Sequence, residues 1–514
     1  MSTGTRVGGV SAGTAVVAAT TLAGVARAAS PTPRAYTATA IPSGRDLHLM
    51  RRFSFGFSAT LQQQVAAAGG ARSWFGAQLS PETVPDRFAN KLYDWFPLLE
   101  TSPRAAYASR ARAGARMEFT RSSARHSMLR QVYSNRQVHE VMVDFWLNHF
   151  HVFAQDNHAW PFRPGYDKTI RTHALGSFED LLRAADMHPA MLMYLNQERS
   201  TGTDINENLG RELLELHTVG IGAGYTEAEV KESARILTGQ LIDRDTLALS
   251  YSDRDHFHGR VTVMGFTHAN PVGQGRAVLD AYFSYLARHP ATARRLARKL
   301  AVRFVSDDPP AALIERVAQA YLLSNTDIKA TLRALVDDPE FYEAATPKVR
   351  TACEDVVATM RAVGVRIGQP TTAANEEGAH AILGLASGIG QKPWHWVTPD
   401  GFPDRSDAWA SASRMLASFR VHYNLAGGFY PTRHIDFQLG ADWLPKRRIR
   451  FDLLVDHLCR RLHGSGSTAA LLGAACSYLD VSPGTVITSA HSVCGRKMPW
   501  LLALLLDSPA HMTR

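Results

Sequence analysis

Histidine and glutamate side chains that could do acid–base or metal chemistry occur between residues 149 and 217 of the 514-residue chain. An imidazole changes its charge near neutral pH, and imidazoles and carboxylates are common ligands of divalent metals. A metal needs three or four such groups to converge, whereas acid–base catalysis needs a pair in contact with the substrate. The candidate metal ligands are His149, His173, His188, Glu212 and His217, and the candidate catalytic residues are His149, Glu212 and His217.

His149 lies on the apolar face of a predicted helix that covers residues 137–153. A projection at about 100° per residue places it with apolar side chains, namely Val138, Met142, Phe145, Trp146 and Phe153. A second, polar face carries Glu140, Asp144, Asn148 and His151 and could be solvated. A single histidine on an apolar face is often an ordinary core residue, so a structural role for His149 stays open.

A second predicted helix, residues 206–219, carries Glu212 and His217 on the two flanks of a buried stripe. That stripe is formed by Leu209, Leu213 and Leu216. A carboxylate and an imidazole at the border of a core need partners, which makes them candidates for a site. A buried structural ion pair would meet the same need, and the sequence does not choose between the two.

His173 and His188 are each predicted to stand at the start of a short helix, with Ser177 as the N-cap of the first. Several isolated buried titratable groups would be expensive, because each loses its hydration separately. We therefore expect all five candidates to converge on one cavity, with the His149 and His217 side chains within about 12 Å of each other.

Several common functions lack their motifs. The chain has no HExxH zinc motif, no GxSxG elbow, no Walker A loop and no GxGxxG before a helix. The formal charge of +9 is spread along the chain, so nucleic-acid binding is not expected. A basic cluster, Arg294, Arg295 and Arg298, is predicted to be a solvated helix face rather than an anion site. The cofactor is unknown and could be a divalent metal.

The composition indicates a globular fold, with 45% apolar and 20% charged residues. The predicted fold class is mostly α: a large multi-helix body with a small inserted β-hairpin at 247–265 and a looser C-terminal helical subdomain. Thr226 and Glu229 form a capping box, and Pro290 starts a further helix. The predicted divisions are a signal peptide at 1–28, a linker at 29–45, a main helical domain at 46–365 and the C-terminal subdomain at 366–514.

Export would change the chemistry of the cysteines. The apolar run after Arg6 and the Ala26-Arg27-Ala28 cleavage site predict an extracytoplasmic protein whose mature chain has no membrane span. In an oxidising compartment we expect one disulfide among Cys459, Cys476 and Cys494, with Cys353 as a buried thiol.

Short blocks around the candidate residues identify a resemblance. They are Trp146-Leu147-Asn148-His149-Phe150, Arg171-Thr172-His173-Ala174-Leu175-Gly176-Ser177-Phe178, His188-Pro189-Ala190-Met191-Leu192, and the two parts of the fourth block, Asn206-Glu207-Asn208 and Arg211-Glu212-Leu213-Leu214-Glu215-Leu216-His217-Thr218. With Lys299-Leu300 and further matches, the chain resembles the bacterial domain-of-unknown-function family 1800 over residues 46–425. The resemblance implies an exported, mostly helical protein, encoded beside a sulfatase-like exported protein that is a possible partner.

Two departures from the family pattern remove acidic residues. Phe257 and Asn196 stand where the family usually has aspartate. Two functions therefore remain: an enzyme with a His/Glu site, possibly metal-dependent, or a non-catalytic extracytoplasmic binding module that acts with the sulfatase-like protein.

Overall fold

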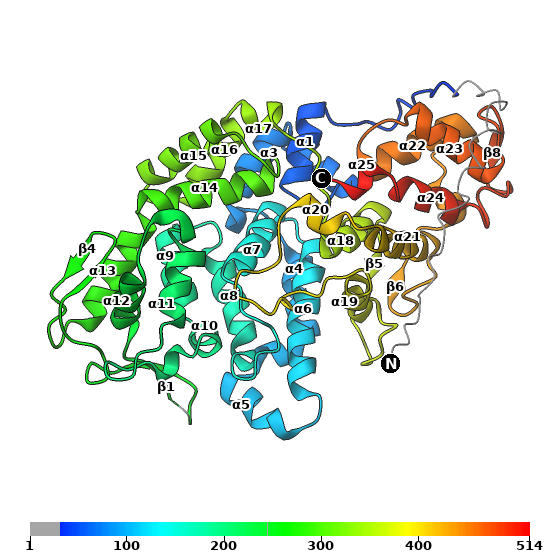
Figure 1. Ribbon diagram of the computed structural model, residues 1–514. Coiled ribbons are helices and arrows are strands. Elements are labelled where there is room, and N and C mark those ends of the chain that lie inside the picture. The colour runs from blue at the N-terminus through cyan, green and yellow to red at the C-terminus, as the bar shows by residue number, and fades with distance from the viewer. Residues whose placement is uncertain (1–30, 244) are drawn as a thin grey trace, which may run out of the picture.

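The computed structural model describes residues 31–243 and 245–514, and this part of the chain contains 25 α-helices and four two-stranded sheets. The mostly α prediction is confirmed. Figure 1 shows a central group of helices flanked by the β-hairpins at one end and by the C-terminal helices at the other. The predicted signal peptide lies outside the described residues.

The first helices build the centre of the molecule. They are α1 (Gly44–Arg52), α2 (Ala59–Ala67), α3 (Ala71–Gln78), α4 (Arg87–Lys91), α5 (Pro103–Ala108), α6 (Ala115–Tyr133) and α7 (Gln137–His149). Before α1, the described part of the predicted linker packs on a C-terminal helix, where the Tyr36 amide donates to the Asp456 carboxylate at 2.6 Å.

The next helices carry most of the candidate residues. They are α8 (Arg163–His173), α9 (Phe178–Asp186), α10 (Pro189–Tyr194), α11 (Asn208–Glu212) and α12 (Glu227–Leu237). Local sequence explains their starts. The Ser177 hydroxyl caps α9, His188 caps α10, and Thr226 and Glu229 form the predicted capping box of α12.

Two β-hairpins follow α12, where one hairpin over 247–265 was predicted. Strand β1 (Gln240–Ile242) pairs with β2 (Leu249–Tyr251), and β3 (Val261–Val263) pairs with β4 (Phe266–His268). The tight turn therefore lies at Met264-Gly265, where both residues have positive φ, as a two-residue hairpin turn requires. The predicted range was wrong because its two strands, β2 and β3, do not pair with each other. Each pairs instead with a strand outside the range, β2 with β1 and β3 with β4.

The helices after the hairpins form a layered group, in which α14 packs on α15 and α15 packs on α16. Their bounds are α13 (Gly275–Ala287), α14 (Pro290–Phe304), α15 (Ala311–Leu323), α16 (Ile328–Asp337) and α17 (Glu340–Glu343). Leu296, Leu300 and Phe304 form the buried face of α14, as predicted.

The last part of the chain contains α18 (Ala352–Val363), α19 (Gly378–Gly388), α20 (Ser406–Trp409), α21 (Ala412–Gly427), α22 (Phe451–His463), α23 (Ala469–Leu479), α24 (Met498–Leu506) and α25 (Pro509–Met512). Short strands pair β5 (Arg366–Ile367) with β6 (Ile435–Asp436) and β7 (Arg448–Arg450) with β8 (Val486–Thr488). Arg514 and Lys348 exchange backbone hydrogen bonds, so the C-terminus returns to the middle of the molecule (Figure 1).

One hydrophobic core runs through the described chain and crosses residue 365, where the sequence predicts a subdomain boundary. That boundary stays a prediction. All four cysteines are free thiols, so the disulfide prediction is wrong for this structure, while Cys353 is buried as expected. Cys459 and Cys494 are instead buried in the core as small apolar side chains. None of the described helices has the length and apolarity that crossing a bilayer requires.

Helices α11 and α12 approach each other closely at Gly210. A Cβ atom there would lie 2.7 Å from the backbone nitrogen of Ala234. We expect Gly210→Ala to lower the free energy of unfolding by about 1–3 kcal/mol, because two backbones must move apart. The matched control is Gly384→Ala in α19, where a Cβ would meet no atom within 4 Å. This substitution should raise the free energy of unfolding by about 0.4–1 kcal/mol, because alanine has fewer conformations than glycine in the unfolded chain. Urea unfolding measures both, and equal effects would contradict the prediction.

Candidate functional site

His149 and His217 lie together in the core. Their ring centroids are 6.2 Å apart, and His149 Nε2 lies 3.1 Å from the backbone carbonyl oxygen of His217. Both side chains are buried, with exposed fractions of 2% and 0%. The prediction that the end of α7 and the 206–219 segment bring these two residues together is confirmed.

The backbone explains why His217 is buried. After α11 the chain makes a π-helical turn, η7 (Leu213–His217), which accommodates one more residue than an α-helical turn. His217 therefore rotates into the core, whereas Leu216, predicted to be buried, is half-exposed. The stripe prediction was wrong at that position because it assumed 3.6 residues per turn throughout.

Lys299 on α14 is the nearest polar neighbour of His149. Its Nζ lies 2.8 Å from His149 Nδ1. A carbonyl oxygen can only accept, so His149 Nε2 carries the proton that it donates to His217, and Nδ1 accepts from Lys299. Burial and the positive charge of Lys299 lower the pKa of His149 well below its usual value. The ring is therefore neutral, and both of its nitrogens are engaged.

The amine of Lys299 is itself perturbed. Burial, and then the charge of Arg295, lower the pKa of Lys299 to about 7. A substantial fraction of this side chain is therefore a neutral amine at neutral pH, which is the form that can accept a proton. Lys299 is not among the residues predicted for the site, although Lys299-Leu300 belongs to the blocks that carry the family resemblance.

Asp186, the last residue of α9, contacts the ring of His217. His217 Nδ1 and Asp186 Oδ1 are 2.8 Å apart, in a contact that is not aligned as a hydrogen bond, and both side chains are fully buried. His217 Nε2 and Asp186 Oδ2 have no hydrogen-bond partner among the described residues. Burial and the charge of Asp186 raise the pKa of Tyr166 well above its usual value. Each buried polar atom without a partner costs free energy, and two atoms of Asp186 and two of His217 lie side by side in this cluster.

Glu212 lies at the edge of the same cluster and is half-buried. Burial raises the pKa of Glu212; the charge of His217 opposes this shift, whereas those of Glu215 and Asp400 add to it. Glu212 is therefore a carboxyl group that holds its proton more strongly than usual.

His188 and His173 take other positions. His188 Nδ1 accepts from the Ala190 amide as the cap of α10, its ring lies 5.1 Å from that of Tyr166, and burial lowers the pKa of His188 to about 3. His173 is half-buried at the last position of α8, not at a helix start. No hydrogen bond, ion pair or ring contact in the described chain joins it to the other four. The structure therefore brings together His149 and His217, with Glu212 nearby.

A cavity of about 410 Å³ opens beside Lys299. Helix α14 contributes Arg295, Arg298, Lys299 and Val302, and α7 contributes Phe145 and Asn148. The opposite wall comes from the segment between α19 and α20, with Trp396, Asp400, Gly401, Phe402, Pro403, Asp404 and Arg405. The carbonyl of Phe402 accepts from the Asn148 amide group at 2.8 Å and holds the two walls together.

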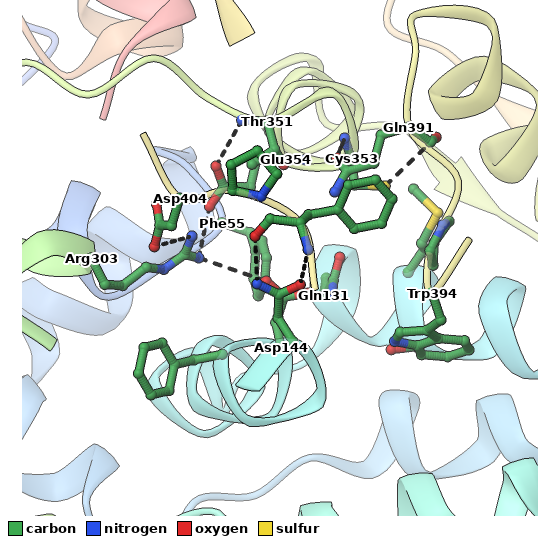
Figure 2. A pocket seen from close by; sticks show the side chains of 17 residues that line it. Phe55, Gln131, Asp144, Arg303, Thr351, Cys353, Glu354, Gln391, Trp394 and Asp404 are labelled. Carbon is green, nitrogen blue, oxygen red and sulfur yellow. Dashed lines mark hydrogen bonds and ion pairs between the residues drawn. The ribbon is translucent and has the colours of Figure 1, made fainter. Parts of the chain in front are cut away.

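A second, small cavity of about 60 Å³ shares wall residues such as Asn148 and Phe402 with it, and four charged residues also line this small cavity: Asp144, Arg303, Glu354 and Asp404 (Figure 2). Arg303 is 2.7 Å from Glu354 and 3.7 Å from both Asp144 and Asp404. Asp144 is 40% exposed, and the small cavity lies against it. Burial raises the pKa of Asp144 to about 6, and the charge of Arg303 only partly offsets this shift. Asp144 therefore lies on the face of α7 that is predicted to be solvated, and its exposed part borders the small cavity.

A family model described as "Protein of unknown function (DUF1800)" matches residues 48–513 of the chain. The chain belongs to the DUF1800 family. The resemblance noted in the sequence is thereby confirmed, and the match extends past residue 425 to nearly the end of the chain. No curated protein and no solved structure matches this DUF1800 chain.

One group of side chains in the described part of this family member has the spacing of metal ligands, and it contains none of the five predicted residues. Asp355, His422 and His511 offer atoms that all lie within 4.8 Å of one another. His422, however, lies between two carboxylates, 3.1 Å from Asp355 and 2.7 Å from Asp507. Although burial opposes it, these charges raise the pKa of His422 to about 9. A protonated imidazole cannot bind a metal, so this cluster fits a buried ion pair better.

The His422 ion pair predicts how stability depends on pH. The pKa of His422 is higher in the folded chain than in the unfolded chain, so its contribution is complete below pH 6.5 and is lost as the pH rises through 9. We expect the difference in unfolding free energy between the wild type and His422→Gln to shrink by about 2–3 kcal/mol from pH 6 to pH 10. Chemical unfolding measures this difference.

The control for this prediction is His457→Gln on α22. Burial lowers the pKa of His457 to about 4, so that ring is neutral throughout the same range. Its effect on stability should change by less than about 1 kcal/mol and in the opposite direction, because only the unfolded ring, with a pKa near 6.5, is partly protonated at pH 6. A constant effect of His422→Gln between pH 6 and pH 10 would contradict the ion-pair assignment.

Proposed function

We propose that this DUF1800 protein is an enzyme that uses Lys299 as a general base in the 410 Å³ cavity, with His149 as a positioning residue. The observation that carries the proposal is the 2.8 Å contact between Lys299 Nζ and His149 Nδ1 at the cavity wall. A neutral amine that donates one N–H to the ring keeps its lone pair for a substrate. The backbone carbonyl of His217 accepts from His149 Nε2, and Asp186 contacts the His217 ring, so these two residues help to hold His149 in place.

Glu212 is the proposed acid partner: it does not line the cavity itself, but the charge of Asp400, which does, helps to raise the pKa of Glu212. A carboxyl group with a raised pKa can return a proton to a leaving group while Lys299 removes one from a hydroxyl group or water. This division of roles retains His149, Glu212 and His217 from the sequence analysis and adds Lys299. It supports the enzyme hypothesis without a requirement for metal.

The family departures at Phe257 and Asn196 do not weaken this proposal. The Arg235 guanidinium lies over the Phe257 ring at 4.8 Å, and Asn196 takes the left-handed backbone conformation, with φ of 57°, just after α10. Asparagine tolerates that conformation well. Both residues therefore have structural roles, and neither lines the cavity beside Lys299.

The reactivity of Lys299 tests the proposal before a substrate is known. Trace acetylation with acetic anhydride, followed by mass spectrometry, measures the pH at which each lysine becomes reactive. We expect a midpoint near pH 7 for Lys299, well below the ordinary lysine value of about 10.4. Arg295→Gln should raise the Lys299 midpoint, because Arg295 repels the ammonium form, whereas Arg294→Gln should not. A Lys299 midpoint near 10 would overturn the assignment.

Activity is tested on aryl acetate, aryl phosphate and aryl sulfate substrates. We expect Lys299→Met to lower kcat/KM by about 100-fold or more, and Lys231→Met to leave it unchanged. Elemental analysis tests the competing metal hypothesis. A stoichiometric metal that is lost in His149→Ala would support a metal-dependent mechanism and contradict the metal-free one. No turnover together with an ordinary Lys299 would favour the binding module that acts with a sulfatase-like protein.

The proposed location is outside the cytoplasm. The apolar run and the Ala26-Arg27-Ala28 site before Ala29 support it. We expect the exported protein to begin near Ala29, which mass spectrometry of material from the native host measures. Exported protein that retains Met1 would contradict the signal-peptide prediction.

A further inference from the structure

Three basic side chains of α14 face one cavity. Arg298 and Lys299 follow Arg295 by three and four residues, so both lie on the side of the helix that carries Arg295, and all three line the cavity. The neighbouring Arg294 points elsewhere and pairs with Glu315 at 3.1 Å in solvent. The prediction of a solvated arginine face therefore holds for Arg294 and for the exposed Arg298, although Arg298 also lines the cavity together with the half-buried Arg295.

These cavity-lining arginines keep their charge uncompensated. Within residues 31–243 and 245–514, no carboxylate lies within 4.0 Å of Arg295 or Arg298, although ion pairs occupy many of the other arginines. Arg295 only donates to the backbone carbonyl of Leu216 at 3.1 Å. The two arginines thus retain most of their hydrogen-bond donors for a ligand.

The acidic residues of the cavity wall do not neutralise them. Asp404 is held by Arg303, Arg514 and Lys348. Asp400 accepts from the Trp396 indole at 2.9 Å and from the Thr398 hydroxyl at 2.5 Å. The cavity is therefore positively charged where α14 lines it, whereas Asp400 keeps its negative charge on the opposite wall.

The remaining surface of the cavity is largely aromatic. Phe145, Trp396 and Phe402 line it, and the rings of Trp396 and Phe402 lie 5.2 Å apart. A volume of about 410 Å³ falls within the range of small-molecule sites. An anionic group would meet α14 while an apolar body packs against these rings.

We propose that this cavity binds an organic phosphate or sulfate ester, with its tetrahedral oxyanion on Arg295 and Arg298 and its organic part on Trp396 and Phe402. The two guanidinium groups, with the Lys299 amine beside them, offer several N–H donors, which suit the several terminal oxygens of a tetrahedral anion better than one planar carboxylate. This inference rests on the proposed function, because it names the substrate class of the Lys299 site.

Calorimetric titration at pH 7 and low ionic strength tests the inference with phenyl phosphate, phenyl sulfate, inorganic phosphate and benzyl alcohol as probes. We expect the phenyl esters to bind more tightly than inorganic phosphate, and benzyl alcohol not to bind. Arg298→Met should weaken binding by about 10-fold or more. Arg294→Met, a matched change on the solvent face of the same helix, should alter it by less than about twofold.

The outcomes separate this inference from the proposed function. No binding of any anion, or equal losses in Arg294→Met and Arg298→Met, would overturn the ester site. Reactive Lys299 at pH 7 without anion binding would leave the general base and remove only its substrate class. Anion binding that depends on Arg298, with an ordinary Lys299, would support the ester site and remove the general base. Where both hold, phenyl phosphate should protect Lys299 from acetylation.

Discussion

The buried ion pairs of Arg303 hold the parts of this protein together. Arg303 on α14 contacts Glu354 on α18 at 2.7 Å, and it also lies near Asp144 on α7 and Asp404 before α20. Loss of one member of such a cluster leaves buried charges uncompensated, which typically destabilises a protein by about 3–5 kcal/mol. Because Lys299 precedes Arg303 by four residues, the same contacts fix how α14 is turned about its axis and aim Lys299 at His149.

Features that depend on neighbouring residues could be predicted from the sequence. A first-turn amide needs an acceptor within two or three residues, so Ser177 and the Thr226–Glu229 box indicate helix starts directly. His188 and His289 show the same logic, since each ring accepts the amide two residues later, just before a helix that begins with proline. The convergence of His149 and His217 was predictable because both border apolar stripes.

Features that depend on distant partners could not be predicted in this way. Glu140 looks solvent-facing in the helix projection, yet it is buried between Arg130 and Arg171. Lys299 looks like one more exposed cation of α14, and only contact with α7, 150 residues earlier, reveals its role. The π-helical turn that buries His217 has no signature in hydrophobic periodicity, because one inserted residue shifts the pattern instead of removing it.

The free-energy cost of burying His217 and Asp186 argues against a purely structural role for this pair. Apolar side chains of similar volume could replace a buried imidazole and carboxylate, often without loss of stability. Instead the chain retains His217 and Asp186 with unpartnered buried atoms and accepts an irregular turn to bury His217. The unfavourable contacts lie next to His149, the histidine that contacts Lys299. Such concentration of unfavourable features beside a cavity is expected where a protein holds a reactive group in position, not where it only fills its core.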